Sequence, residues 1–187
     1  ETSVEKNVYS GVSNLLANEP LEDLMQDEFE KLGPVIFDKD DKDFANKIRS
    51  TLNESDILDS FQRIGMKAPL DMPLCDFVAS LNNKSNGGIG STDVGDVSWV
   101  VPTVQARVAT CAVGTPFHTW QTVAQGKAPA AHKGMIHAAK IMAATASSLI
   151  KNPQKLDNAK KAFKSQVKEN PYVCPIPNGV MPPIVKE

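Results

Sequence analysis

The chain has 187 residues, of which 41% are hydrophobic and 22% are charged, and its formal net charge is -2. This length and composition suit one soluble globular domain with a core of its own. The small net charge and the absence of a bilayer-length apolar run lead us to expect no nucleic-acid and no membrane partner. Three widely spaced cysteines, Cys75, Cys111 and Cys174, argue against a disulfide scaffold. They favour a reducing compartment, so we expect a cytoplasmic protein.

The first third of the chain predicts a strand followed by three helices. Residues 2–9 have an irregular strand-like pattern. The first helix is expected between Asn18, which can cap it, and Gly33, which can end it. Its apolar positions share one face: Leu21, Leu24, Met25, Phe29 and Leu32. Two shorter helices are expected over 40–52 and 55–65.

The middle of the chain predicts two strands. A short strand is expected near 74–80, followed by a flexible loop that delivers the glycine-rich acidic segment 90–99. Residues 104–113 alternate in polarity at first and become apolar near their end, as a strand does when it enters a buried sheet. Gly114 and Pro116 then break the pattern, and a helix pattern follows.

Two helices are expected in the C-terminal part. A long alanine-rich helix spans about 129–151, where small residues allow close packing on a sheet. We expect one buried stripe along it: Met135, Ile136, Ala139, Met142, Ala143, Ala146 and Ile150. The last helix is capped by Asn152, begins at Pro153 and carries a face of lysines that we interpret as solvated. Together these elements predict an α/β fold, with the proline-rich tail from Pro171 extended over its surface.

His118 is the first candidate functional residue. It lies in a glycine- and proline-shaped turn just past the carboxyl end of the expected strand, where α/β sheets bind their ligands. A hydrogen-bonded structural histidine is the alternative. A metal site needs three or more ligands, and the chain has three histidines and no H-E-x-x-H or C-x-x-C pattern. The turn by itself indicates a site without fixing its chemistry.

Several segments together resemble a known family. They are Gly90-Ser-Thr-Asp-Val-Gly-Asp-Val-Ser-Trp99, Gly114-Thr-Pro-Phe-His-Thr-Trp-Gln121, Ala131-His-Lys-Gly-Met135 with Ala138-Ala-Lys140, and Pro171-Tyr-Val-Cys-Pro-Ile-Pro177. In this order they are similar to the C-terminal part of dinuclear-metal amidohydrolases and carboxypeptidases related to aminoacylase and the auxin-conjugate hydrolases. The resemblance covers most of the chain after about residue 85. It implies the C-terminal part of a zinc-peptidase-like three-layer α/β catalytic domain, with a short remnant of an inserted lid domain.

The resemblance implies a role for each candidate residue. His118 is the last metal ligand of a site that holds two zinc or manganese ions, which imidazole binds well. Thr115 lies in the same loop and Asp93 in the acidic loop that precedes it, so both are expected in the active-site loops or in contact with substrate. His132, near a helix N-terminus that attracts anions, can bind substrate or merely contact its own helix end. Asp93 and Asp96, three residues apart in this loop, can orient a ligand histidine or bind substrate, and the alternative is that they cap a turn or a helix.

The family's other metal ligands and its glutamate general base come from an N-terminal half without a counterpart here. We therefore assign no catalytic residue and expect the chain alone to be inactive. Residues 1–13 are expected to be the last strand of the lid or dimerisation domain, and residues 14–187 the C-terminal portion of the catalytic domain.

The implied function is metal-dependent hydrolysis of the amide bond in N-acyl or p-aminobenzoyl amino acids such as p-aminobenzoyl-glutamate. The implied partners are that small-molecule substrate, the N-terminal half of the same enzyme, and other subunits of a homo- or hetero-oligomer. The alternative is a noncatalytic binding or assembly subunit with the same fold.

Overall fold

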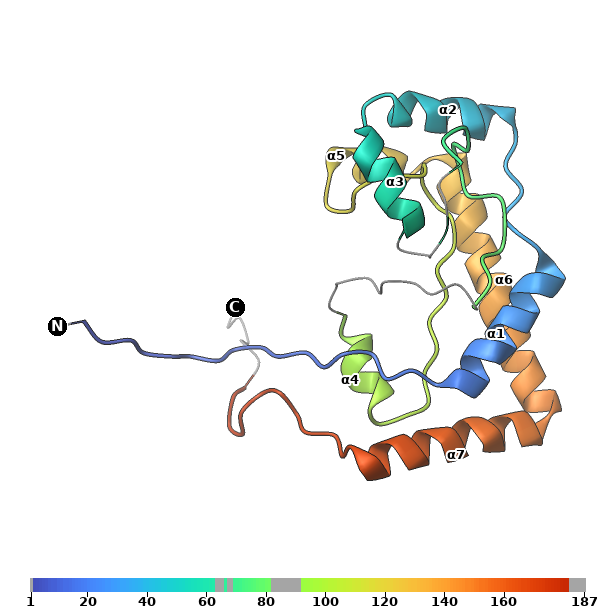
Figure 1. Cartoon of the computed structure of the whole chain (residues 1–187). Coiled ribbons are helices and arrows are strands. Elements are labelled where there is room, and N and C mark those ends of the chain that lie inside the picture. Colours follow the sequence, from blue (N-terminus) through green and yellow to red (C-terminus); the bar gives the residue numbers. More distant parts are fainter. Residues whose placement is uncertain (1, 63–65, 67–68, 82–91, 182–187) are drawn as a thin grey trace, which may run out of the picture.

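The computed structural model describes residues 2–62, 66, 69–81 and 92–181. Its helices are α1 (Glu19–Leu32), α2 (Lys39–Arg49), α3 (Glu54–Gln62), α4 (Val94–Ser98), α5 (Trp120–Gln125), α6 (Pro129–Lys151) and α7 (Pro153–Glu169). Helices α1, α6 and α7 pack against one another, and an extended N-terminal arm projects away from the body (Figure 1). Helices α2, α3 and α5 gather at the other end of α6.

Local end signals fix helix α1 where the sequence predicted it. The side-chain oxygen of Asn18 accepts a hydrogen bond of 3.3 Å from the Leu21 N–H, as a capping residue does. Its amide also donates to the Ala159 carbonyl at 3.0 Å, which joins α1 to α7. Gly33 ends the helix with φ 71, a conformation that favours glycine. The predicted first helix is confirmed at both ends.

The other predicted helices are present with small adjustments. Helix α2 begins one residue after Asp38, whose carboxylate and that of Asp41 form a reciprocal capping box. Helix α3 buries Ile57 and Phe61, and its expected end at residues 63–65 lies outside the described residues. Helices α6 and α7 have the predicted bounds, and Asn152 caps α7.

The prediction of which face of α6 is buried is wrong. The residues that α6 buries are Ala130, Gly134, Ile141 and Thr145, whereas Met135, Met142 and Ile150 are 60%, 56% and 81% exposed. Both faces of the middle of this helix are apolar, so its periodicity did not show which face the fold covers. The small Ala130 and Gly134 permit the closest approach to the rest of the chain.

The predicted strands are not observed, so the α/β fold is not confirmed. Residues 2–13, 74–80 and 102–110 run without helix and without strand pairing in the part of the chain that the structure describes. A strand requires a neighbour with which to exchange N–H and C=O hydrogen bonds. The single bond from the Val113 N–H to the Pro73 carbonyl, at 2.9 Å, does not make a ladder. The expected loop at 82–91 lies outside the described residues.

Two apolar clusters place the candidate histidine turn. One contains Val35, Phe37, Ala45, Ile48, Leu74, Ala112 and Ala130, and the other contains Ile57, Phe61 and Val113. Ala112 and Val113, one in each cluster, are consecutive residues, so the chain is anchored on both sides immediately before Gly114. The burial of these two residues therefore anchors the start of the turn that carries His118.

Gly134 sets how closely the extended segment lies on α6. A Cβ atom at this position would collide with the Ala109 carbonyl oxygen. Gly134→Ala should therefore lower the free energy of unfolding by about 1–2 kcal/mol, because the overpacking outweighs the roughly 1 kcal/mol gained in helix propensity. Chemical denaturation of the variant measures this change.

Gly126→Ala is the matched control for this substitution. Gly126 caps α5 at φ -60, and its nearest contact, the Val123 carbonyl oxygen, is an ordinary 3.5 Å away. We expect a change below about 0.5 kcal/mol. Equal stabilities of the two variants would show that the segment does not rest on Gly134.

Candidate functional site

The turn that carries His118 is held by buried polar groups. Gly114 has φ 91, and a Cβ there would meet Ile57 at 2.7 Å, so this position needs glycine. The Thr115 hydroxyl, on a residue only 9% exposed, donates to the Ala112 carbonyl at 2.7 Å. After the turn, the hydroxyls of Thr119 and Thr122 both donate to the Pro116 carbonyl, at 2.7 and 2.8 Å. The backbone around His118 is thereby fixed.

Gln125 is the organising residue that the sequence reading missed. It is 3% exposed at the end of α5, and its side-chain oxygen accepts the Ala112 N–H at 2.7 Å. Its amide group donates to the Thr115 hydroxyl at 3.1 Å and to the Gln121 carbonyl at 3.0 Å. A buried glutamine thus links the entrance of the turn to the helix after it. A lone glutamine in a short helix pattern carries no sequence signal of this role.

His118 itself is exposed and conformationally unusual. Its φ of 64 lies in the left-handed region, where residues other than glycine are uncommon and are often found at functional sites. In the described part of the chain its imidazole has no hydrogen-bond or ion-pair partner. The neighbouring Phe117 and Trp120 are 66% and 60% exposed. The structure therefore places His118 as an exposed side chain on a turn whose backbone is hydrogen-bonded on both sides.

The two acids of the glycine-rich segment have different surroundings. Asp93 is exposed, precedes α4 and makes no side-chain capping bond. Asp96 accepts hydrogen bonds from the Ser13 hydroxyl at 2.8 Å, the Ser13 N–H at 3.2 Å and the Tyr172 hydroxyl at 2.9 Å. Asp96 therefore fastens the N-terminal segment and the C-terminal tail to α4, whereas the Asp93 carboxylate forms no hydrogen bond within the described residues.

The Asp96 cluster is electrostatically consistent with that structural role. Hydrogen bonds from Ser13 and then Tyr172 hold the pKa of Asp96 below its usual value. The hydrogen bond that the Tyr172 hydroxyl donates to the Asp96 carboxylate raises the pKa of Tyr172 to about 12. The Tyr172 ring stacks on Trp99, whose indole N–H donates to the Asn14 carbonyl at 2.8 Å. Because the Asp96 pKa is lowered, its contribution to stability is present at neutral pH and is lost as the pH falls through that lowered value.

His132 lies in the first turn of α6. The helix has no side-chain cap and no acidic residue of its own in that turn, but the carboxylates of Asp38, Asp40 and Asp41 from the start of α2 border the same cavity as its first residues. His132 is exposed, while Ala130, two residues earlier and so on nearly the opposite face, is buried. This histidine therefore faces outward and away from α2.

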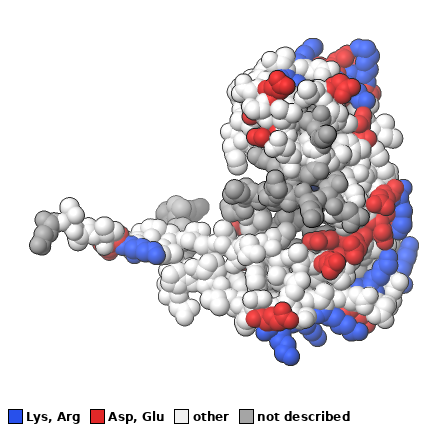
Figure 2. All heavy atoms as spheres, in the orientation of Figure 1, with Lys and Arg blue, Asp and Glu red and all other residues white. Residues whose placement is uncertain are grey.

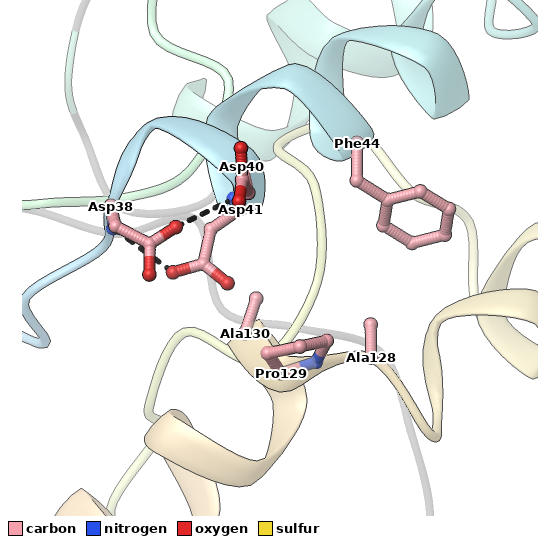
Figure 3. Close-up of a pocket in the computed structure, with 7 residues that line it drawn as sticks. All are labelled: Asp38, Asp40, Asp41, Phe44, Ala128, Pro129 and Ala130. Atoms are coloured by element: carbon pink, nitrogen blue, oxygen red, sulfur yellow. Dashed lines mark hydrogen bonds between the residues drawn. The ribbon is translucent and has the colours of Figure 1, made fainter.

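A cavity of about 200 Å³ lies between the starts of α2 and α6 (Figure 3). Its walls are Asp38, Asp40, Asp41, Phe44, Ala128, Pro129 and Ala130. The Asp38 and Asp41 carboxylates are engaged in the capping box of α2 and in ion pairs with Lys133. None of the predicted site residues lines this cavity, and its carboxylates disfavour an anionic ligand.

The candidate residues do not form one cluster in this chain. Helix α4, which follows Asp93, and helix α5, which follows His118, lie near opposite ends of the extended segment 102–110 (Figure 1). Among the described residues there is no group of three or more His, Cys, Asp or Glu side chains able to hold a metal ion. In the described part of the chain, the exposed His118 imidazole and the exposed Asp93 carboxylate each lack a hydrogen-bond or ion-pair partner.

Two further observations concern the cysteines and the membrane. Cys75, Cys111 and Cys174 are free thiols, and burial raises the pKa of the Cys75 and Cys111 thiols. No helix in the described residues is both long and apolar enough to cross a membrane.

Comparison with known proteins bears directly on the family. No family model and no solved structure matches this chain. Among curated proteins, the B subunit of p-aminobenzoyl-glutamate hydrolase from Escherichia coli (strain K12) is 35% identical over 196 aligned residues. The alignment covers the whole of this chain and 41% of the relative. The chain therefore spans less than half of the relative's length. This chain is therefore homologous, over its whole length, to the C-terminal part of the p-aminobenzoyl-glutamate hydrolase B subunit, as its motifs predicted.

Proposed function

We propose that this chain is the C-terminal portion of a metal-dependent amidohydrolase that cleaves p-aminobenzoyl-glutamate or a related N-acyl amino acid. The observation that carries the proposal is the 35% identity, along the entire chain, to a hydrolase subunit with that substrate in its name. A fixed turn with a free imidazole, at the position that the motifs single out, supports the same function.

His118 supplies one ligand to a site that holds two zinc or manganese ions. Its exposure and its lack of a hydrogen-bond partner in the described residues fit an imidazole reserved for a metal. A metal pair held there would supply Lewis-acid polarisation of the amide carbonyl and a water molecule of lowered pKa. One histidine cannot hold two metals, so the remaining ligands and the general base come from polypeptide outside this chain. The buried hydrogen bond between the Gln125 amide and the Thr115 hydroxyl helps to hold the backbone of the turn that carries His118.

The substrate-facing groups follow from the chemistry of the substrate. The glutamate moiety carries carboxylates, and we assign their binding to His132, which is exposed on the side of α6 that faces away from the carboxylates lining the cavity at its start. Phe117 and Trp120 are exposed beside His118 and offer apolar area to an aminobenzoyl ring. We assign Asp93 to the substrate-binding loops on the resemblance, although α4, which it precedes, and α5 lie near opposite ends of segment 102–110 in this chain. We also propose that residues 1–13 are the last strand of the lid or dimerisation domain in the complete enzyme.

The assembly of the enzyme is the remaining part of the proposal. The relative is named as a subunit, so we propose a further subunit as partner in addition to the N-terminal half of the same enzyme. The noncatalytic subunit with the same fold is the second candidate, and both candidates are compatible with the absence of a three-ligand group in the described residues. Activity of the completed protein separates the two candidates.

A chimera tests the proposed function. Residues 1–187 replace the matched C-terminal region of the homologous E. coli protein, and the product is assayed with the other E. coli subunit for p-aminobenzoate release. We expect hydrolysis that a chelator abolishes and added zinc or manganese restores. The E. coli protein without its C-terminal region is the control and should be inactive. A chimera that unfolds cooperatively but does not hydrolyse the substrate would favour the noncatalytic subunit.

A further inference from the structure

The extended N-terminal arm, residues 2–10, is not itself attached to the body. Val4 and Tyr9 are 95% and 78% exposed, and no residue before Gly11 forms a hydrogen bond or an ion pair within the described part of the chain. Figure 2 shows few charged side chains where the arm meets the body, because on the face drawn they gather over the ends of the molecule and along α1 and α7. The direction of the arm is therefore decided at the junction that follows it, residues 11–16.

Helix α4 binds the junction closely. The Asp96 carboxylate accepts the Ser13 N–H with one oxygen, at 3.2 Å, and the Ser13 hydroxyl with the other, at 2.8 Å. The Ser98 hydroxyl, on a residue only 1% exposed, accepts the Leu16 N–H at 2.7 Å. A Cβ atom at Gly95 would collide with the Ser13 carbonyl oxygen, so the two backbones are in direct contact. The junction is therefore fixed on α4.

The C-terminal tail that follows α7 holds the same junction. The Tyr172 hydroxyl donates at 2.9 Å to Asp96 Oδ1, the oxygen that also accepts the Ser13 hydroxyl. Three residues further along the tail, Pro175 lies against Gly11, where a Cβ atom would come within 2.9 Å of the proline Cβ. The tail thus reaches the junction at two points, one through a shared carboxylate and one through direct contact.

The tail is itself anchored, so it can transmit the position of the body to the junction. The Trp99 ring stacks on Tyr172, with ring centroids 6.4 Å apart, and its indole N–H donates to the Asn14 carbonyl at 2.8 Å. Helix α7, from which the tail emerges, is joined to the start of α1 by the hydrogen bond from the Asn18 amide to the Ala159 carbonyl. The junction is therefore held by α4 and by a tail whose origin is fixed on α1.

We propose that Tyr172 and Asp96 are positioning residues, and that their hydrogen bond makes the C-terminal tail a strap that fixes the direction in which the arm leaves the body. In the homologous E. coli protein more than half of the length lies before the matched region, so a large polypeptide precedes the arm there. A rotation at a few junction residues moves everything attached to them as a unit. The strap therefore sets where the preceding polypeptide lies relative to the turn that carries His118. The inference rests on the proposed function only for its catalytic readout.

Distances between two spin labels test whether the strap directs the arm. Ketone-bearing side chains introduced at Lys6 and Lys151, which are both exposed, carry the labels and leave the free cysteines untouched. The parent chain should give one narrow distance distribution. Tyr172→Phe removes only a hydroxyl and should broaden that distribution by about twofold or more, at a temperature where the variant is fully folded. Tyr9→Phe is the matched control, because its exposed hydroxyl has no partner in the described residues, and it should change nothing.

Variants of Asp96 give a graded readout of the same contact. Asp96→Asn keeps an acceptor oxygen but loses the charge, so it should broaden the distribution less than Asp96→Ala, which removes both acceptors. Tyr172→Phe added to Asp96→Ala should broaden it no further, because both changes break one hydrogen bond. The Ser13 amide should exchange its hydrogen about 10-fold faster or more in Asp96→Ala, while the amides of α7 keep their rates.

The chimera adds a catalytic readout. Tyr172→Phe should raise KM for p-aminobenzoyl-glutamate by about 5-fold with little change in kcat, because substrate must then bind between parts that are no longer held in one arrangement. The metal content should stay at the parental value, since the variant removes no proposed ligand. Tyr9→Phe should keep the parental KM.

Three results would overturn the inference. Equal distance distributions in the parent and in folded Tyr172→Phe would show that the strap does not direct the arm. Equal broadening by Tyr9→Phe would assign the effect to something other than the contact with Asp96. An active chimera whose KM is the same with and without the Tyr172 hydroxyl would remove the positioning role. The expected distance changes together with an inactive chimera would leave this inference standing while the proposed function fails.

Discussion

Replacement of His118 by alanine should lower kcat/KM of the chimera for p-aminobenzoyl-glutamate by about 100-fold or more. The substitution removes the ligand that we propose for the two-metal site, and the exposed side chain has no hydrogen-bond or ion-pair partner among the described residues. The initial rate of p-aminobenzoate release measures the effect. Thermal unfolding of the same variant should show a Tm close to that of the parent.

Two further variants separate ligand loss from damage to the turn. His118→Gly keeps the left-handed φ of 64 without strain, so it should be as inactive as His118→Ala and at least as stable. Val123→Ala, at a residue of α5 that is 80% exposed, should keep near-parental activity. Near-normal turnover in the two His118 variants would return His118 to a structural role.

Replacement of Gln125 by leucine should lower the free energy of unfolding of the isolated chain by about 2–4 kcal/mol. The Ala112 N–H would lose its acceptor in a buried position, and the Thr115 hydroxyl would lose one donor. Urea denaturation of the variant measures the change. In the chimera, the same variant should also lower activity, because the loosened turn no longer fixes His118.

Gln121→Leu is the matched control in the same helix. Its side chain makes one long hydrogen bond of 3.5 Å, to the Thr51 hydroxyl, and its carbonyl bond to Gln125 remains. The expected loss is below about 0.5 kcal/mol. A similar loss for both glutamines would mean that Gln125 does not organise the turn.

Helix ends could be predicted from the sequence because their causes are local. Asn18 and Asn152 bind N–H groups two or three residues ahead, and Gly33 adopts a φ that other residues avoid. These interactions do not depend on what the rest of the chain does. The true cap of α2, Asp38, lies just before the Asp40 start that the pattern indicated, because its partner Asp41 completes a capping box.

Strands and buried faces could not be predicted with the same success because their causes are not local. The alternation at 104–108 is present in the fold, yet a strand exists only when another segment pairs with it. The apolar stripe of α6 was identified correctly as apolar, but Gly134 and Ala130 allow the opposite face to approach the chain more closely. Periodicity predicts side-chain polarity, and packing decides burial.

The candidate site was predicted in part. The glycine and proline around His118 predicted a turn, and the structure has one with a left-handed histidine. Asp96 is hydrogen-bonded to Ser13, 83 positions away, and to Tyr172, 76 positions away. No local sequence pattern indicates contacts over such separations. Gln125 was missed for the same reason, since its importance comes from the buried N–H of Ala112.

The metal content per polypeptide, measured by elemental analysis after dialysis, tests most directly whether this chain is one part of a two-metal hydrolase. The account predicts two zinc or manganese ions in the chimera, fewer than two in its His118→Ala variant, and no tightly bound pair in the isolated chain. Two tightly bound ions in the isolated chain, or two ions in the chimera with and without His118, would contradict it.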